Sequence, residues 1–124
     1  MNNLFIIKEK GTPEIDFNSV TGILNITGQS YPEDSSEFYV EVLAWVREFI
    51  KSVDMKVVFN VNLQYFNTSS SKAILDIFDI LENYFKLGNE VEVNWYYAEE
   101  DDDIYDHGIE FTEDLSLPYK IIKY

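Results

Sequence analysis

The segment Val57-Val58-Phe59-Asn60-Val61-Asn62-Leu63-Gln64 decides how this chain folds. Its apolar residues alternate with polar ones, which is the two-residue period of a β-strand. The expected strand runs from Met55 to Leu63, with one apolar face and one face carrying amides. A strand buried on both faces would be apolar almost throughout. The pattern therefore predicts a sheet that helices cover on one face only.

Amphipathic helices flank this strand on both sides. The first follows Ser30-Tyr31-Pro32-Glu33-Asp34-Ser35, where Asp34 or Ser35 can cap it. The second is expected from about Ser69 to Leu87, and Gly88 is suited to end it. The predicted apolar stripe of the first helix consists of Phe38, Val42, Trp45, Val46, Phe49, Ile50 and Val53. That of the second consists of Ile74, Ile77, Phe78, Leu81 and Phe85.

A strand–helix–strand–helix–strand order follows from these segments. Crossovers between parallel strands are right-handed, so strands that advance in one direction place both helices on the same face. The predicted fold class is α/β, a two-layer mixed sheet with two main helices on one face, in a single domain over residues 1–124. The remaining expected strands are Leu4–Lys8, Glu14–Phe17, Gly22–Thr27, Val91–Tyr97, Ile109–Thr112 and Tyr119–Tyr124, and the expected loop is Glu99–Asp103.

The chain is strongly acidic, with 23 Asp and Glu against 9 Lys and Arg and a formal charge of −14. Such a surface repels phosphate backbones and anionic lipids, so nucleic acid and membranes are poor partners and a basic protein patch is a good one. The absence of cysteine excludes a thiolate site. The start of the chain resembles no signal peptide and no stretch is long enough to span a membrane, so we expect a soluble, cytoplasmic protein.

Four hydroxyl residues, Thr68 to Ser71, precede Lys72 where the second helix begins. Free backbone N–H groups and the positive end of the helix dipole meet there. One interpretation is structural: Thr68 or Ser69 caps the helix and the other hydroxyls are solvated. The other is a phosphorylation site, since a helix start tolerates an added phosphate.

No catalytic constellation is apparent elsewhere. His107 is the only histidine, and we interpret it as an isolated surface residue in an acidic loop rather than part of a zinc site or a serine-based triad. The carboxylates of Glu99 to Asp106 suggest a divalent cation as an alternative ligand, but their spacing does not fit an EF-hand.

Glycines stand singly at element ends, and we expect Trp45 and Trp95 in the core. The chain is predicted to be no enzyme and to need no cofactor or metal.

Two motifs carry a resemblance to a known family. Leu63-Gln64-Tyr65-Phe66-Asn67-Thr68-Ser69-Ser70-Ser71-Lys72 is one, and Gly28-Gln29-Ser30-Tyr31-Pro32-Glu33-Asp34 with Phe38-Tyr39 is the other. Together they resemble the SiaC-type bacterial regulatory phosphoproteins, and the similarity extends over essentially the whole chain.

The resemblance implies a STAS-like partner-switching domain. A dedicated protein kinase would phosphorylate Thr68, and a PP2C-type phosphatase would remove the phosphate. The unphosphorylated form would bind an effector such as a diguanylate cyclase, which links the switch to cyclic-di-GMP and biofilm formation. The implied partner-binding residues are Asn67, Ser69, Ser70, Ser71, Lys72, Ser30, Tyr31, Pro32 and Glu33. An anti-sigma-factor antagonist is the alternative, although the Asp-Ser-(Ser/Thr)-Gly phosphosite usual in those proteins is missing. The oligomeric state stays open.

Overall fold

The computed structural model describes residues 1–124 as six strands and three helices. Their order follows the predicted alternation of strands and helices through the middle of the chain. In chain order the elements are β1 (Leu4–Ile6), β2 (Glu14–Phe17), β3 (Ile23–Ser30), α1 (Ser35–Ser52), β4 (Val57–Phe66), α2 (Thr68–Lys86), β5 (Val91–Tyr97), α3 (Asp102–Thr112) and β6 (Tyr119–Lys123).

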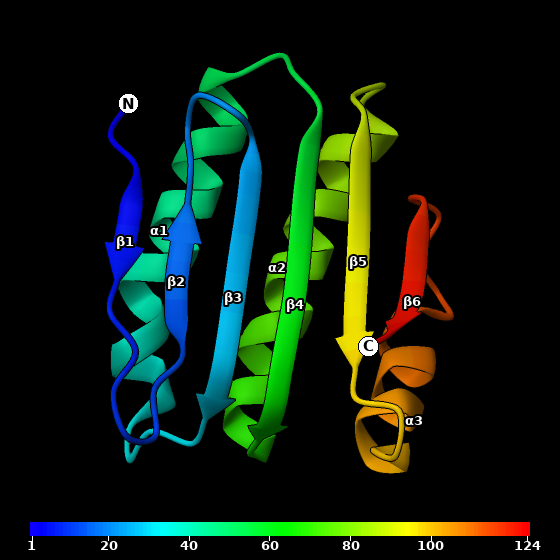
Figure 1. Ribbon diagram of the computed structural model, residues 1–124. Coiled ribbons are helices and arrows are strands. Elements are labelled where there is room, and N and C mark those ends of the chain that lie inside the picture. The colour runs from blue at the N-terminus through cyan, green and yellow to red at the C-terminus, as the bar shows by residue number, and fades with distance from the viewer.

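All six strands form one mixed sheet in the spatial order β1-β2-β3-β4-β5-β6 (Figure 1). The first three strands pair antiparallel, and β3 to β6 pair parallel. Figure 1 shows α1 and α2 behind the sheet, α3 near the lower end of β5, and the opposite face of the sheet free. The predicted α/β class is confirmed, with a third helix in addition to the two expected.

The core lies between the sheet and the helices. Val57, Phe59, Val61 and Leu63 of β4 are all buried, as the alternation predicts. Asn67 and Asp34 cap α2 and α1 by accepting hydrogen bonds from backbone N–H groups in each first turn.

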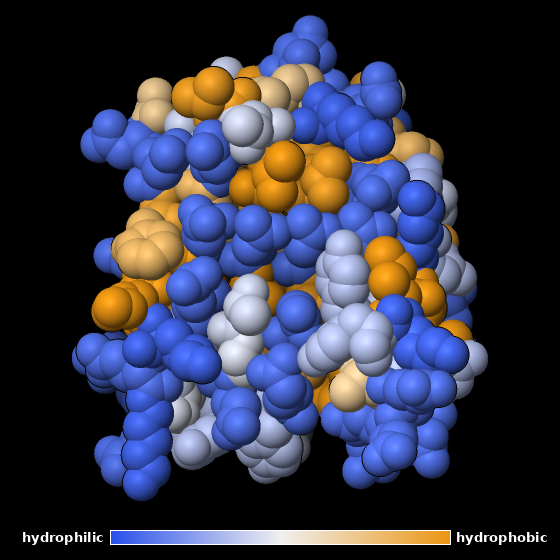
Figure 2. Space-filling view, in the orientation of Figure 1, coloured by the Kyte–Doolittle hydropathy of each residue, from blue (hydrophilic) through white to orange (hydrophobic).

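The open face of the sheet carries a row of amides. The Asn60 side chain donates to Asn25 Oδ1 at 2.8 Å, and the Asn94 side chain donates to Asn60 Oδ1 at 2.9 Å. Figure 2 shows this face covered largely by hydrophilic side chains, with separate hydrophobic patches. Amides bonded to one another across neighbouring strands satisfy most of their polar groups without a covering helix, although Asn94 Oδ1 is buried without a partner.

The apolar stripe predicted for α1 needs correction. Tyr39 is buried to 1% exposure, whereas the predicted Phe38 is only partly buried. Trp45 is not in the core either: its ring stacks on Phe49 with centroids 4.8 Å apart, and its Nε1–H donates to the Asn2 carbonyl. A large amphipathic ring at the end of a stripe lies at the boundary, where its N–H finds a partner.

The third helix was not expected. The segment predicted as a loop (Glu99–Asp103) and a strand (Ile109–Thr112) contains α3 instead. Its N-cap is Asp101, whose carboxylate accepts from the Ile104 N–H at 3.1 Å, and two further acids follow in the first turn. Consecutive acids at a helix start complement the dipole, so the charge run that indicated a loop in fact begins a helix.

Candidate functional site

The hydroxyl cluster lies where two parallel strands end. Ser30 is the last residue of β3 and Phe66 the last of β4, and these strands are neighbours in the sheet. Helices α1 and α2 begin just beyond these strand ends. Their first turns therefore lie together at the carboxyl ends of β3 and β4 (Figure 1). The Asn67 N–H donates to the Ser30 carbonyl at 3.0 Å and joins the two strand ends.

Asn67, rather than Thr68 or Ser69, caps α2. Its Oδ1 accepts from the Ser70 N–H at 2.9 Å while its backbone is extended. Asparagine is among the best N-cap residues, because its short side chain reaches the free N–H groups of the first turn. The structural interpretation of the two hydroxyl residues as caps is therefore wrong, and Thr68 is the first residue of the helix.

A chain of hydroxyl groups runs from the interior to the surface beside this cap. Tyr39 OH and Ser30 Oγ share a hydrogen bond of 2.7 Å, and Ser30 Oγ donates to Ser70 Oγ at the same distance. Ser35 Oγ lies 3.4 Å from Ser70 Oγ and accepts from Ser69 Oγ at 2.8 Å. Five side chains from β3, α1 and α2 thus form one network, and four of these residues are buried.

Burial raises the pKa of the Tyr39 hydroxyl to about 12, although its contacts with Ser30 and Ser70 partly oppose this. The phenol is therefore uncharged at physiological pH. The network is a set of neutral hydrogen bonds, with no nucleophile activated by a neighbouring base.

Thr68 stands apart from this network. Its side chain is exposed, and its Oγ1 takes part in no hydrogen bond within the chain. The neighbouring hydroxyls are engaged: Ser69 with Ser35, Ser70 in the interior, and Ser71 with the Thr68 carbonyl at 2.6 Å. Thr68 thus carries the free hydroxyl of the cluster.

The remaining predicted site residues lie at the same edge. Lys72 is exposed and 3.5 Å from Asp76 on the outer side of α2. Tyr31 packs edge-on against Tyr65, with ring centroids 5.9 Å apart. The next two residues, Pro32 and Glu33, continue along the surface into α1, half-buried and exposed respectively.

Sequence reasoning missed two members of the network. Ser35 entered only as a candidate cap, and Tyr39 was not assigned to the buried face of α1. Both are buried and lie four residues apart, one turn along the same helix face. Two hydroxyl residues at this spacing were the one sequence signal for a buried polar network on α1. Only the pairing of β3 with β4 brings Ser30 into contact with this network.

The acidic segment does not form a metal site. No group of three or more His, Asp or Glu side chains is placed to hold a metal ion. His107 is half-buried on α3, with its ring 5.1 Å from that of Phe66, and so does not lie in a loop. The divalent-cation alternative has no support from this geometry. None of the helices is long and apolar enough to cross a membrane.

The fold and the site together define a class: small α/β domains with helices on one face of the sheet and an exposed, unengaged hydroxyl at a helix start. Comparison with known proteins narrows this class. Residues 6–124 match the family model of the "SiaC family regulatory phosphoprotein". The chain therefore belongs to the SiaC family.

Similar proteins align with this chain over nearly its full length. An uncharacterized protein of Pseudomonas aeruginosa (strain UCBPP-PA14) is 36% identical over 121 residues, which are 98% of this chain and 96% of that protein. The structure of SiaC from P. aeruginosa matches with a TM-score of 0.92 and 35% identity, covering 100% of both chains. A crystal structure of the diguanylate cyclase SiaD with its activator SiaC matches with a TM-score of 0.94 and 35% identity, covering 98% of this chain and 99% of that one.

Proposed function

We propose that this protein is a non-enzymatic partner-switching regulator, controlled by reversible phosphorylation of Thr68. One observation carries the proposal: in the hydroxyl cluster, Thr68 alone combines exposure with an unengaged Oγ1. A modifying enzyme reaches this hydroxyl without breaking a bond within the chain. The hydroxyl of each neighbouring serine already forms a hydrogen bond, which modification there would break.

A phosphate on Thr68 leaves the fold intact. It adds a charge of about −1.5 to −2 at pH 7. At the first residue of α2 that charge gains about 0.3–1 kcal/mol from the helix dipole. Because Asn67 does the capping, the cap does not depend on the threonine hydroxyl. The modification therefore changes the charge of the surface and not the packing beneath it.

The partners in the cycle are a protein kinase, a PP2C-type phosphatase and an effector. In one solved structure SiaC is bound to the diguanylate cyclase SiaD, which it activates. This complex supports a diguanylate cyclase as the effector and a role in cyclic-di-GMP signalling. The unphosphorylated chain binds it. The contact surface surrounds Thr68 and consists of Asn67, Ser69, Ser70, Ser71, Lys72, Ser30, Tyr31, Pro32 and Glu33.

Phosphate reverses binding because it places two negative charges within a fitted interface. A like charge opposite it, or loss of its hydration, costs several kcal/mol when the partner docks. The whole of residues 1–124 acts as one regulatory domain in the cytoplasm. It performs no chemistry itself, and the enzymes that add and remove the phosphate supply all of it.

Incubation with the cognate kinase and ATP, followed by intact mass and peptide mapping, tests the acceptor. We expect one phosphate on Thr68, none on a Thr68→Ala variant, and normal modification of a Ser71→Ala control. Phosphorylation of Thr68→Ala at the wild-type rate would refute the assignment.

Effector binding tests the switch. Thr68→Asp is expected to weaken binding of the diguanylate cyclase by at least about tenfold, a like-charge cost of the size interfaces show. The uncharged Thr68→Asn variant is the matched control and should bind nearly as well as wild type. Far-UV circular dichroism of both variants should match wild type, and equal binding by all three proteins would contradict the proposal.

A further inference from the structure

A second surface adjoins the hydroxyl cluster along α2 and lies between α2 and α3, with Leu75 one helical turn beyond Ser71. It is a groove with a volume of about 500 Å³. Its apolar lining comes from both sides: Leu75 and Phe78 from α2, and Phe111 and Leu115 from α3 and the turn after it. Phe78 is buried at 1% exposure, whereas Leu75 is exposed at 36%. The groove thus has a buried phenylalanine at its floor and an accessible leucine at its edge.

The rim of this groove is acidic. Asp79, Glu110 and Asp114 line it, and none of the three forms an ion pair within the chain. The one basic residue on the rim, Lys86, forms an ion pair of 3.8 Å with Glu82. Three unpaired carboxylates around an apolar floor fit an occupant that is apolar in the middle and basic at its sides.

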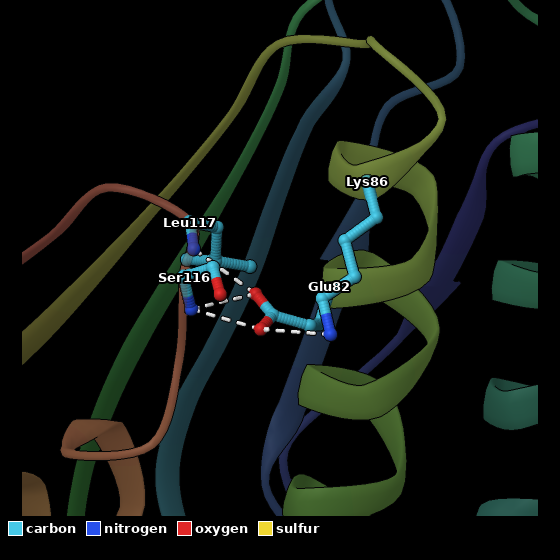
Figure 3. A network of polar contacts seen from close by, with 4 residues as sticks. All are labelled: Glu82, Lys86, Ser116 and Leu117. Carbon is cyan, nitrogen blue, oxygen red and sulfur yellow. Dashed lines mark hydrogen bonds and ion pairs between the residues drawn. The ribbon is translucent and has the colours of Figure 1, made fainter.

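The two walls of the groove are held together by Glu82. Its carboxylate accepts from the Ser116 N–H at 2.8 and 3.0 Å and from the Leu117 N–H at 3.0 Å (Figure 3). Burial alone would raise the pKa of this carboxyl, but the Ser116 and Leu117 bonds and the Lys86 charge lower it below its ordinary value. The charged clamp fixes the turn after α3 to α2, so the groove is preformed before any partner arrives.

We propose that this groove binds a basic amphipathic helix of a partner protein, with large apolar side chains on the floor and Lys or Arg against the rim. A helix fits the length: Leu75 and Lys86 are eleven residues apart on α2, about 16 Å, which matches about three helical turns. A second copy of this chain is a poor occupant because both copies carry a charge of −14. This inference does not rest on the phosphorylation of Thr68.

The groove is also distinct from the switch surface in its response to phosphate. A phosphate on Thr68 has the same sign as the rim, so it does not repel a basic helix. The partner that occupies the groove is therefore expected to bind both forms of the chain. Loss of phosphorylation and loss of groove binding are consequently separate outcomes.

The probe is an amphipathic peptide of about 18 residues built from leucine and lysine, with leucine at the helical i, i+3, i+4 and i+7 positions. Its control is an isomer of the same composition in which the leucines do not share one face. The readout is a titration of ¹⁵N-labelled protein followed by backbone amide shifts. We expect the changes to concentrate in residues 75–86 and 110–117, and the isomer to bind at least about tenfold more weakly, because only one helical face fits the floor.

A charge reversal tests the rim. The triple variant Asp79→Lys, Glu110→Lys and Asp114→Lys is expected to weaken peptide binding by about tenfold or more, because three partly exposed ion pairs are lost and reversed. The matched control reverses three exposed acids elsewhere, Glu41→Lys, Glu48→Lys and Asp54→Lys, and alters the net charge equally. Its effect should stay within about threefold, since distant charges are screened.

Three results would overturn the proposal. These are equal losses in the two triple variants, amide changes spread over the whole acidic surface, or an isomer that binds as tightly as the amphipathic peptide. The mapping on the wild-type protein stands by itself should a variant fold poorly. A Thr68→Asp protein that no longer binds the peptide would refute the separation of the two surfaces.

Discussion

The Ser69 hydroxyl donates a 2.8 Å hydrogen bond to the Ser35 hydroxyl, and this bond joins the first turn of α2 to the first turn of α1. The two residues are 34 positions apart in the chain. They meet because β3 and β4 are parallel neighbours whose carboxyl ends lie side by side. The proposed acceptor, Thr68, is therefore presented by a first turn that the network already holds in place. A charge added there acts on an approaching protein rather than on a flexible loop.

The cap of α2 provides a first test, because the capping residue and the acceptor are adjacent. Asn67→Ala is expected to lower the free energy of unfolding by about 0.5–2 kcal/mol, since the Ser70 N–H loses its partner. Thr68→Ala should change it by less than about 0.5 kcal/mol, because the side chain is exposed and unbonded. Urea denaturation of the two variants measures both values, and the reverse order would show that Thr68 has a structural role.

The buried phenol of Tyr39 provides a second test, which concerns the hydroxyl network. Tyr39→Phe removes the 2.7 Å hydrogen bond to Ser30 and is expected to cost about 0.5–1.5 kcal/mol. Tyr105→Phe is the matched control, because the Tyr105 side chain is exposed and its hydroxyl has no partner within the chain. Chemical denaturation should separate the two variants. Equal stability of Tyr39→Phe and Tyr105→Phe would mean that the network adds nothing to folding.

The Glu82 clamp predicts a specific dependence on pH. Its pKa is lowered in the folded chain, so its contribution is complete above the unfolded value of 4.5 and is lost as the pH falls through the folded value. Glu82→Gln should therefore cost about 1–3 kcal/mol at pH 7, where charge-assisted bonds to two backbone N–H groups are weakened. The difference from wild type should shrink when the pH drops below about 4.5.

Thermal or urea unfolding of wild type and Glu82→Gln across this range gives the difference at each pH. Glu113→Gln, which changes an exposed glutamate near the same turn, is the control and should show no comparable trend. A penalty for Glu82→Gln that stays constant between pH 7 and pH 3 would contradict the clamp.

The contact between α3 and the sheet depends on a glycine. A Cβ on Gly108 would lie 2.5 Å from Cδ1 of Trp95, whose indole N–H also donates to the Ile104 carbonyl at 2.9 Å. Gly108→Ala is therefore expected to destabilise the protein by about 1–3 kcal/mol, although alanine is the better helix former, because the added methyl overpacks the core. Asp106→Ala on the exposed side of α3 should be nearly neutral. A Gly108→Ala protein as stable as wild type would show that α3 shifts freely.

Much of the fold could be predicted from local patterns. The alternation in β4 indicated which face the helices cover, and the helical stripes located α1 and α2 to within a few residues. These signals are readable because each one depends on residues two to four positions apart. The acidic stretch misled for the same reason. Five consecutive acids suggest a loop locally, but the last two begin α3, which packs against Trp95 and Phe66.

The sequence by itself determined the central strands, the side that the helices cover and the place of the hydroxyl cluster, since side-chain periodicity and capping preferences act between near neighbours. Only the tertiary structure decided which hydroxyl stays free. Ser30 and Ser70 are 40 residues apart and bond only because β3 pairs with β4, and this leaves Thr68 alone at the surface. The groove between α2 and α3 is equally a product of long-range contacts, because the Glu82 carboxylate finds its partners 34 and 35 residues further along the chain.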